Sequence, residues 1–278
     1  KTWSWSAHGN AYASEGDSHG HNVISEQIAR DVTLSEAPGG IFSSAYLGCT
    51  SCHDPHGNQN FRILYGYNVL PGTPDGPRYN GGTFPFASPA PLAKGNSRRT
   101  IKDGSGEETD VAHTVYKNGM TDWCSNCHGD FHSEGLGGIS THPTRSMGST
   151  VAAAYGAYVS TDTPTGGDPT VSYRGLVPFE DVDVDLTTVD SSNYTAGPTG
   201  SDNVMCLSCH RAHASAFSDI ARWDMGETFI IDSHPADETE GATVDDLANM
   251  YYDYTFVTDN QRSLCNKCHV KDAYDGAY

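Results

Sequence analysis

The 278-residue chain contains no apolar run long enough to cross a membrane as a helix. Its longest candidate, residues 151–159, has about half of the roughly 18–20 residues that a bilayer span requires. Positive charge is also scarce, with 16 Lys and Arg against 35 Asp and Glu and a formal net charge of −19. A polyanion such as nucleic acid is therefore excluded as the expected partner, whereas positively charged partners and good solubility fit this surface.

Apolar side chains are scarce as well. They make up 36% of the residues, while the chain contains 30 glycines and 14 prolines. This is too little apolar side chain, and too much turn chemistry, for a conventional core of this size. Another source of buried apolar area is needed.

No cysteine lies outside four short motifs of one pattern, Cys-x-x-Cys-His. These are motif 1 (Cys49–His53), motif 2 (Cys124–His128), motif 3 (Cys206–His210) and motif 4 (Cys265–His269). The pattern is the attachment sequence of c-type haem, in which each thiol adds across a porphyrin vinyl group and the adjacent histidine binds the iron. We predict four covalently attached haem c groups, held by Cys49, Cys52, Cys124, Cys127, Cys206, Cys209, Cys265 and Cys268, with His53, His128, His210 and His269 as proximal ligands.

Three other readings of the cysteines are weaker. Paired Cys-x-x-Cys motifs can bind zinc, but zinc does not require a histidine after each pair. Eight cysteines are far below the roughly 8–10% of a disulfide scaffold. A thioredoxin-like dithiol would explain one motif and not four. With haem as the source of buried area, we expect the chain without haem not to fold.

We expect a mostly irregular, loop-rich fold with short α-helices and little β-structure, wrapped around a continuous chain of haems. Residues 66–110 and 160–203 are dense in Gly, Pro, Asn and Thr and indicate long loops. A short edge strand is expected at 180–186, whose acidic residues fit a solvated face better than a calcium site. Helical patterns occur at the motifs and near 213–223 and 244–253. The whole chain, 1–278, is expected to be one unit, in which 1–48 is an amino-terminal segment and 49–278 carries the motifs.

The sixth ligand of each iron decides the function. A methionine raises the potential, a vacant position permits substrate chemistry, and a second histidine leaves electron transfer as the task. None of the five methionines has a spacing that indicates ligation, so we expect bis-histidine ligation throughout. Nine histidines remain for this role: His8, His19, His21, His56, His113, His132, His142, His213 and His234.

Local context ranks these histidines. His56 and His213 each follow a proximal histidine by three residues, so each shares its face of a short helix and cannot reach the opposite side of the same iron. We expect both to bind a neighbouring haem. His21 precedes motif 1 and is a candidate for the haem there, and His142 precedes a proline that fixes an extended backbone. His132 competes with these, His19, His113 and His234 remain possible, and the distal pairings stay open.

Several stretches resemble the OmcS- and OmcE-like family of extracellular cytochrome nanowires, which are filament-forming multihaem c-type cytochromes. The resemblance covers about a third of the chain, at all four motifs and in the order of the family. The matching stretches are GHNV (20–23), APGG (37–40), CTSCHDPHG (49–57), the run from MTDWC through CHGDFH to THP (120–143), NVMCLSCHRAHAS (203–215) and QRSLCNKCHVKD (261–272).

The resemblance implies closely stacked bis-histidine haems and head-to-tail polymerisation into a helical filament. It also implies that one haem in each subunit takes its distal histidine from the next subunit. By position, the histidines that match the family are His21, His56, His132, His142 and His213. The six-haem relatives carry two further motifs at the amino end, beside the donated histidine, and this chain has no matching stretch there. We therefore expect His8, with His19 as the alternative, to bridge to the third haem at His210.

The expected function is extracellular electron transfer along a conductive homopolymer to external acceptors or other cytochromes. The alternative is a monomeric tetrahaem shuttle in the periplasm or at the cell surface. An enzyme is not expected, because a multihaem reductase needs an open axial position. Haem is attached to such motifs outside the cytoplasm, so we expect a secretory leader to have been removed.

Overall fold

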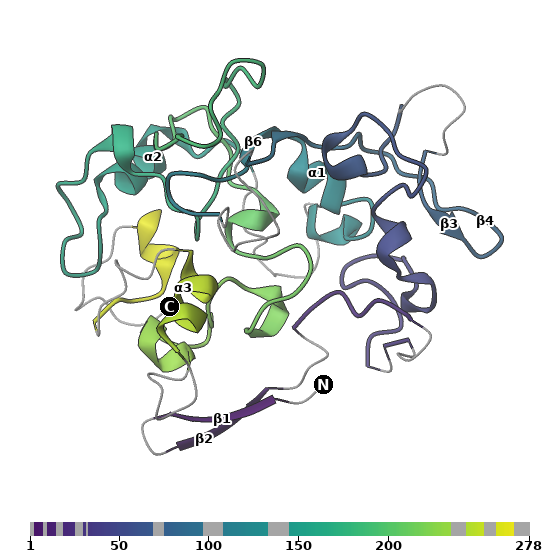
Figure 1. The fold of residues 1–278 in the computed structure, drawn as a ribbon, viewed down its shortest axis with the longest axis horizontal. Coiled ribbons are helices and arrows are strands. Elements are labelled where there is room, and N and C mark those ends of the chain that lie inside the picture. The colour runs from purple at the N-terminus through teal and green to yellow at the C-terminus, as the bar shows by residue number, and fades with distance from the viewer. Residues whose placement is uncertain are drawn as a thin grey trace. The chain divides into compact units, whose positions relative to one another are not determined.

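The structure is a computed structural model. It describes residues 3–7, 10–14, 19–25, 30–31, 33–68, 75–96, 108–132, 145–234, 243–252 and 260–269. The elements are short and joined by long irregular segments, as Figure 1 shows. Within the described residues, no helix has the length and apolar character that a bilayer crossing requires.

Regular structure is limited to a few short elements. The α-helices of the described residues are α1 (Met120–Cys124), α2 (Gly148–Ala157) and α3 (Val244–Tyr251). Three two-stranded sheets pair β1 (Trp3–Ala7) with β2 (Asn10–Ser14), β3 (Arg78–Tyr79) with β4 (Gly82–Thr83), and β5 (Leu92–Lys94) with β6 (Val115–Asn118). The 3-10 turns are Ser44–Tyr46, Cys49–Ser51, Phe61–Ile63, Gly129–His132, Pro169–Val171, Cys206–Ser208, Ser218–Ile220, Ile230–Ser233 and Leu264–Lys267. The expectation of a loop-rich fold with short helices and little sheet is confirmed.

The chain divides into two compact units. Unit 1 comprises Lys1–Gly20, Gly95–Val115 and Arg145–Tyr278, and unit 2 comprises His21–Lys94 and Tyr116–Thr144. Motifs 3 and 4 therefore belong to unit 1, and motifs 1 and 2 belong to unit 2. The prediction that the whole chain forms one unit stays a prediction.

Unit 1 has an aromatic core around α2 and α3. Tyr155, Leu176, Trp223 and Tyr251 are each 1% exposed or less, and Cys265 and Cys268 of motif 4 pack against this cluster. Helix α3 forms because Leu247 and Tyr251, four residues apart, place two buried side chains on one face.

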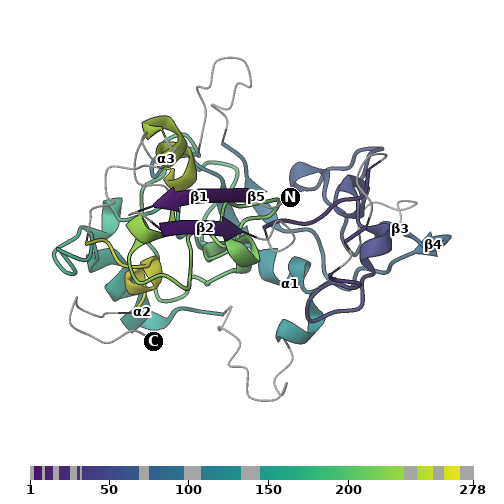
Figure 2. The same ribbon diagram turned by 90° about the horizontal axis from the view of Figure 1, so that it is seen from below.

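Unit 1 also contains the hairpin of β1 and β2, a narrow antiparallel ribbon in Figure 2. Its register pairs Trp3 with Ser14 and Ala7 with Asn10. His8 and Gly9, which connect the two strands, lie outside the described residues.

Unit 2 has a smaller aromatic core. Phe42, Tyr65, Phe84 and Phe86 are buried, and Trp123 and Cys127 of the motif 2 region pack against them. Each unit thus places its densest apolar packing against cysteines of a haem-attachment motif.

Two expectations about local structure are wrong. Residues 180–186 form no strand; Glu180 makes only an isolated bridge to Asn203, and the segment continues as turns. Residues 213–223 form no α-helix, because the 3-10 turn Ser218–Ile220 contains left-handed backbone at Asp219 and Ile220.

Candidate haem-attachment sites

Each of the four motifs folds as one helical turn. The backbone N–H of the histidine donates to the carbonyl oxygen of the first cysteine at 3.1, 3.0, 3.0 and 2.9 Å in motifs 1 to 4. Motif 2 begins in the last turn of α1, and the other three form 3-10 turns. The turn brings both thiols and the imidazole to one short segment, as attachment of a single porphyrin requires.

The second cysteine of each motif is shielded from water. Burial raises the pKa of the Cys52 and Cys268 thiols to about 11, and that of the Cys127 and Cys209 thiols to about 12. None of the eight cysteines forms a disulfide. The buried thiols are therefore neutral at physiological pH and lie in an apolar environment that suits a porphyrin edge.

Within each unit, the cysteines of two motifs are close enough to interact. The charge of Cys52 contributes to the raised pKa of Cys127 in unit 2, and the charges of Cys265 and Cys268 contribute to that of Cys209 in unit 1. Burial is the larger cause in both cases. Each unit thus brings together two attachment motifs that are distant in the sequence.

Motifs 1 and 3 lie in a shared module that is longer than the motif itself. The module comprises residues 48–65 in unit 2 and residues 205–222 in unit 1. In both copies, the serine of the motif caps the turn, since Ser51 Oγ and Ser208 Oγ accept from the backbone N–H three residues earlier at 2.9 and 3.1 Å. A return segment then pairs with the motif: Tyr65 N–H donates to the Cys52 carbonyl at 2.9 Å, and Arg222 N–H donates to the Cys209 carbonyl at 2.8 Å.

The return segment of the module holds the proximal histidine. His53 Nδ1 lies 2.8 Å from the Arg62 carbonyl oxygen, and His210 Nδ1 lies 2.8 Å from the Asp219 carbonyl oxygen, nine residues later in each case. The backbone reaches this position through consecutive left-handed residues, 62–63 and 219–220, with φ between 52° and 58°. The sequence shows the motif and the following histidine but gives no signal for this longer repeat.

The proximal histidine of motif 2 is held by a different segment. His128 Nδ1 lies 2.8 Å from the Pro38 carbonyl oxygen, and Asp130 N–H donates to the Gly39 carbonyl at 2.6 Å. Gly40 packs directly on the motif, because a Cβ there would lie 1.7 Å from the Cys127 carbonyl oxygen. The segment 37–40 therefore requires glycine at this position to approach motif 2.

These three contacts fix the tautomer of each ring and so decide which nitrogen is available to a metal. A carbonyl oxygen accepts only, so Nδ1 carries the proton and donates it, and Nε2 is left unprotonated for metal. This is the tautomer that an axial haem ligand needs. His269 of motif 4 is exposed.

His21 and His128 have the spacing of two axial ligands of one iron. Their ring centroids lie 6.1 Å apart, within unit 2. Two metal–imidazole bonds of about 2.0–2.1 Å, with each ring centre about 1.1 Å beyond its nitrogen, give a separation of about 6.3 Å. The residues therefore fit a six-coordinate haem at motif 2, whereas sequence context had associated His21 with motif 1.

Other candidate ligands lie in different surroundings. The side chain of His56 is 93% exposed and its Nδ1 lies 3.6 Å from Asp54, and His213 is also exposed. His8 and His142 lie outside the described residues, as does the side chain of His132, whose backbone ends the turn Gly129–His132.

Three further histidines are buried or partly buried in unit 1. His113 stacks on Tyr173 at 3.5 Å, and its two ring nitrogens lie 2.9 and 2.8 Å from the carbonyl oxygens of Thr114 and Tyr194. Both nitrogens thus face carbonyl oxygens, although a neutral ring can donate from only one of them; burial, which is the larger effect, lowers the pKa of the ring. His234 is buried beside Tyr251, and His19 Nε2 is buried without a hydrogen-bond partner among the described residues.

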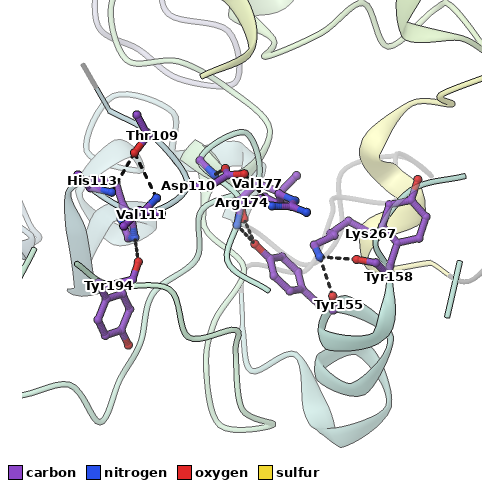
Figure 3. Close-up of polar contacts among 12 residues, drawn as sticks. Thr109, Asp110, Val111, His113, Tyr155, Tyr158, Arg174, Val177, Tyr194 and Lys267 are labelled. Carbon is purple, nitrogen blue, oxygen red and sulfur yellow. Dashed lines mark hydrogen bonds and ion pairs between the residues drawn. The ribbon is translucent and has the colours of Figure 1, made fainter. Parts of the chain in front are cut away.

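A buried lysine joins motif 4 to α2. Lys267, the second inner residue of the motif, donates from Nζ to the carbonyl oxygens of Tyr155 and Tyr158 at 2.8 and 2.7 Å, as Figure 3 shows. Tyr155 lies in the last turn of α2 and Tyr158 is its C-cap residue, and carbonyls at the C-terminal end of a helix accept donors from side chains. Burial lowers the pKa of Lys267 to about 7. Sequence reasoning missed this residue, because nothing near motif 4 in the sequence indicates that its lysine reaches the end of a helix more than a hundred residues earlier.

The same close-up contains the ion pair that orders the neighbouring loops. Arg174 donates to Asp110 at 2.7 Å, and the other Asp110 oxygen accepts from Gly175 N–H at 2.7 Å. Tyr155 Oη donates to the Val177 carbonyl and accepts from Arg174 N–H. The polar network thus connects residues 109–114, α2 and motif 4 within unit 1.

Comparisons with known proteins give one curated relative and two solved structures. The C-type cytochrome OmcS of Geobacter sulfurreducens is 32% identical over an alignment that is 326 positions long with its gaps and that covers 98% of this chain and 73% of that protein. The outer membrane cytochrome S filament of that organism matches with a TM-score of 0.73 at 28% identity, and the OmcS nanowires studied by cryo-EM match with a TM-score of 0.71 at 29% identity. Each match covers 99% of this chain and 78% of the other. No family model matches the chain.

Proposed function

The chain belongs to the OmcS family of multihaem c-type cytochromes, and on this premise we propose that it is a tetrahaem electron carrier that polymerises head-to-tail into an extracellular filament. Electrons pass along closely stacked haems to external acceptors or other cytochromes. The observation that carries this proposal is the fold likeness to subunits of the OmcS filament over 99% of the chain.

Four haem c groups are proposed from the four motifs. When bound, haem supplies an iron that cycles between the ferric and ferrous states. The chain's own residues attach the porphyrin through paired thiols, orient the proximal imidazole and shield one thiol of each pair from water. Backbone carbonyls fix the tautomer of His53, His128 and His210.

Bis-histidine ligation is proposed for every haem. At motif 2 the 6.1 Å separation of His21 and His128 supports these two residues as the pair. The other distal ligands are proposed from His56, His142 and His213, and from His8 of the neighbouring subunit. Because imidazole occupies both faces of the iron, electron transfer is favoured over reductase chemistry.

We propose His8 as the bridging ligand from its place in the amino-terminal segment, ahead of all four motifs. His8 and Gly9 stand between β1 and β2 in the sequence and lie outside the described residues. In this role, one copy would donate a ligand to a haem of the next copy. A heterologous contact of this kind does not close and generates a helical filament.

Electron microscopy of the purified holoprotein tests this function. We expect long fibres, four covalent haems by mass spectrometry, and a fully low-spin spectrum in both redox states. Discrete particles at all concentrations would instead support the monomeric shuttle, and a substantial high-spin fraction would support an enzyme with a vacant iron.

The variant His8→Ala separates assembly from haem attachment. We expect it to keep four covalent haems, to convert one to high spin, and to lose the fibres. His113→Ala is the matched control, because both ring nitrogens of His113 contact backbone carbonyls. Unchanged fibres in His8→Ala would remove His8 from the bridging role.

A further inference from the structure

The two copies of the module share their backbone hydrogen bonds but carry opposite charges at one equivalent position, which is buried in the first copy and partly buried in the second. The residue after the proximal histidine is Asp54 in the 48–65 copy and Arg211 in the 205–222 copy. Their backbone N–H groups make the same contact, to the Ile63 and Ile220 carbonyls at 2.8 and 2.7 Å. The last residue of the module differs likewise, being the neutral Tyr65 in one copy and Arg222 in the other.

The 48–65 copy contains a buried anion. Asp54 is 3% exposed and its carboxylate accepts from the His56 N–H at 2.9 Å. The cationic group nearest to it in the described residues is the His56 ring, 3.6 Å away, which is charged only when protonated. A His56 ring that binds iron is neutral, so Asp54, the residue after His53, would then have no cation within ion-pair distance among the described residues. Its charge would act on a haem held by His53.

The 205–222 copy contains two guanidinium groups instead. Arg222 is 5% exposed and donates to the carbonyls of Leu207 and Gly175 at 2.6 and 3.1 Å. Arg211 donates to the Met250 carbonyl and lies 4.8 Å from the ring centre of Tyr252.

The charge of these two arginines is not neutralised locally. Their acceptors are carbonyls and the Tyr252 hydroxyl, and the described residues place no carboxylate within ion-pair distance of either guanidinium. The field of Glu108 reaches Arg211, but its carboxylate is bonded to Thr114.

Charges near a haem change its reduction potential, because reduction lowers the net charge of the iron by one. Reduction adds one electron, so a neighbouring carboxylate disfavours the ferrous state and a neighbouring guanidinium favours it. The effect is large for buried groups, because water and salt screen them little. Arg62 and Asp219 carry the reverse pair of charges at another equivalent position, but both side chains are exposed, and their fields are therefore screened.

We propose that the two copies of the module set their haems at different reduction potentials, lower at His53 through Asp54 and higher at His210 through Arg211 and Arg222. This inference rests on the proposed function, since it requires haem at motifs 1 and 3. The step is a one-electron exchange in which the haem at His210 becomes ferrous as another haem of the chain becomes ferric. Electrons in a partly reduced protein accordingly reside at the haem of motif 3 in preference to that of motif 1.

The test is a spectroelectrochemical titration of the full-length holoprotein, resolved into four one-electron components. In Asp54→Asn, which keeps the hydrogen bond to His56, one component is expected to rise in potential. In Arg211→Gln the reduction potential of one component is expected to fall. Each shift is expected to reach at least threefold in the one-electron equilibrium constant, or about 30 mV at 59 mV per tenfold.

Matched variants separate a charge effect from a packing effect. Arg211→Lys keeps the charge and is expected to keep the potential. Arg62→Gln and Asp219→Asn change exposed charges, and each position lies nine residues after the histidine of its motif. Each is expected to shift the potential of any component by no more than a third of the shift seen in Asp54→Asn or Arg211→Gln.

The inference is overturned if Arg62→Gln and Asp219→Asn shift the potentials as much as Asp54→Asn and Arg211→Gln do. It is also overturned if Asp54→Asn and Arg211→Gln both leave the titration unchanged. A fall in potential as large in Arg211→Lys as in Arg211→Gln would overturn it as well. Failure of the proposed function gives a different result. It appears in the unmodified protein as fewer than four covalent haems or as high-spin iron, before any variant is titrated.

Discussion

The substitution Gly40→Ala tests how the segment 37–40 holds the haem at motif 2. The added Cβ would lie 1.7 Å from the Cys127 carbonyl oxygen, and it must recede by about 1.3 Å to reach the 3.0 Å below which real Cβ contacts are essentially absent. The same segment presents the Pro38 carbonyl to His128 Nδ1 at 2.8 Å. A displacement of that size along the bond takes the two atoms beyond hydrogen-bonding range.

The expected cost follows from these two effects. Overpacking of this kind costs about 1–3 kcal/mol, and the lost hydrogen bond costs about 1 kcal/mol, so Gly40→Ala is expected to destabilise unit 2 by about 2–4 kcal/mol. Electron paramagnetic resonance of the oxidised holoprotein should show three low-spin haems and one perturbed haem, and denaturant unfolding should show the loss of stability.

Gly129→Ala is the matched control for this experiment. Gly129 follows His128 directly, and a Cβ there meets nothing within 4 Å. It is expected to keep four low-spin haems and to change stability by no more than about 0.5 kcal/mol. The reasoning is refuted if Gly40→Ala behaves like Gly129→Ala in both measurements.

Three further predictions concern side chains in both units. His21→Ala should convert one haem to high spin, because the His21 and His128 rings have the spacing of two ligands of one iron. His113→Ala should leave every haem low-spin. An unchanged EPR spectrum of His21→Ala would reject His21 and His128 as a ligand pair. Asp110→Ala should lower the free energy of unfolding by about 3 kcal/mol, since it removes the carboxylate that binds Arg174 and the acceptor of the Gly175 N–H. A loss below about 1 kcal/mol in urea titrations would contradict this account. Burial lowers the pKa of His113 in the folded state, so the unfolded chain binds this proton first as pH falls. The stability associated with a neutral His113 is therefore present above about pH 6.5 and declines as pH falls below it, until the folded pKa is reached. In His113→Phe, which keeps the stack on Tyr173, unfolding midpoints should depend less steeply on pH between 7.5 and 5, and equal slopes would count against the assignment.

Much of the chemistry was predictable from sequence, because it depends on local spacing. The four motifs and the loop-rich fold follow from patterns within a few residues, and the proximal role of the motif histidines stays a prediction. Helix α3 was predictable for the same reason, since Leu247 and Tyr251 recur with the helical period.

The failures share a physical cause, which is that backbone groups found partners far along the chain. In the expected strand at 180–186, Val182 N–H donates to the Asp202 carboxylate and Glu180 pairs with Asn203, so no ladder forms. In the expected helix at 213–223, the left-handed backbone at Asp219 directs its carbonyl to His210. Neither contact leaves a periodic signal in the sequence. The approach of the His21 ring to the His128 ring leaves no such signal either, and which iron His21 binds stays a prediction.

The module divides its two tasks between different atoms. Main-chain carbonyls orient the imidazole, and they are present whatever the amino acid, so Arg62 and Asp219 serve equally well. Side chains at other positions take no part in this contact, and they differ between the copies, as Asp54 and Arg211 do. A substitution at such a position can therefore change the charge near one motif without removing the contact that orients its histidine.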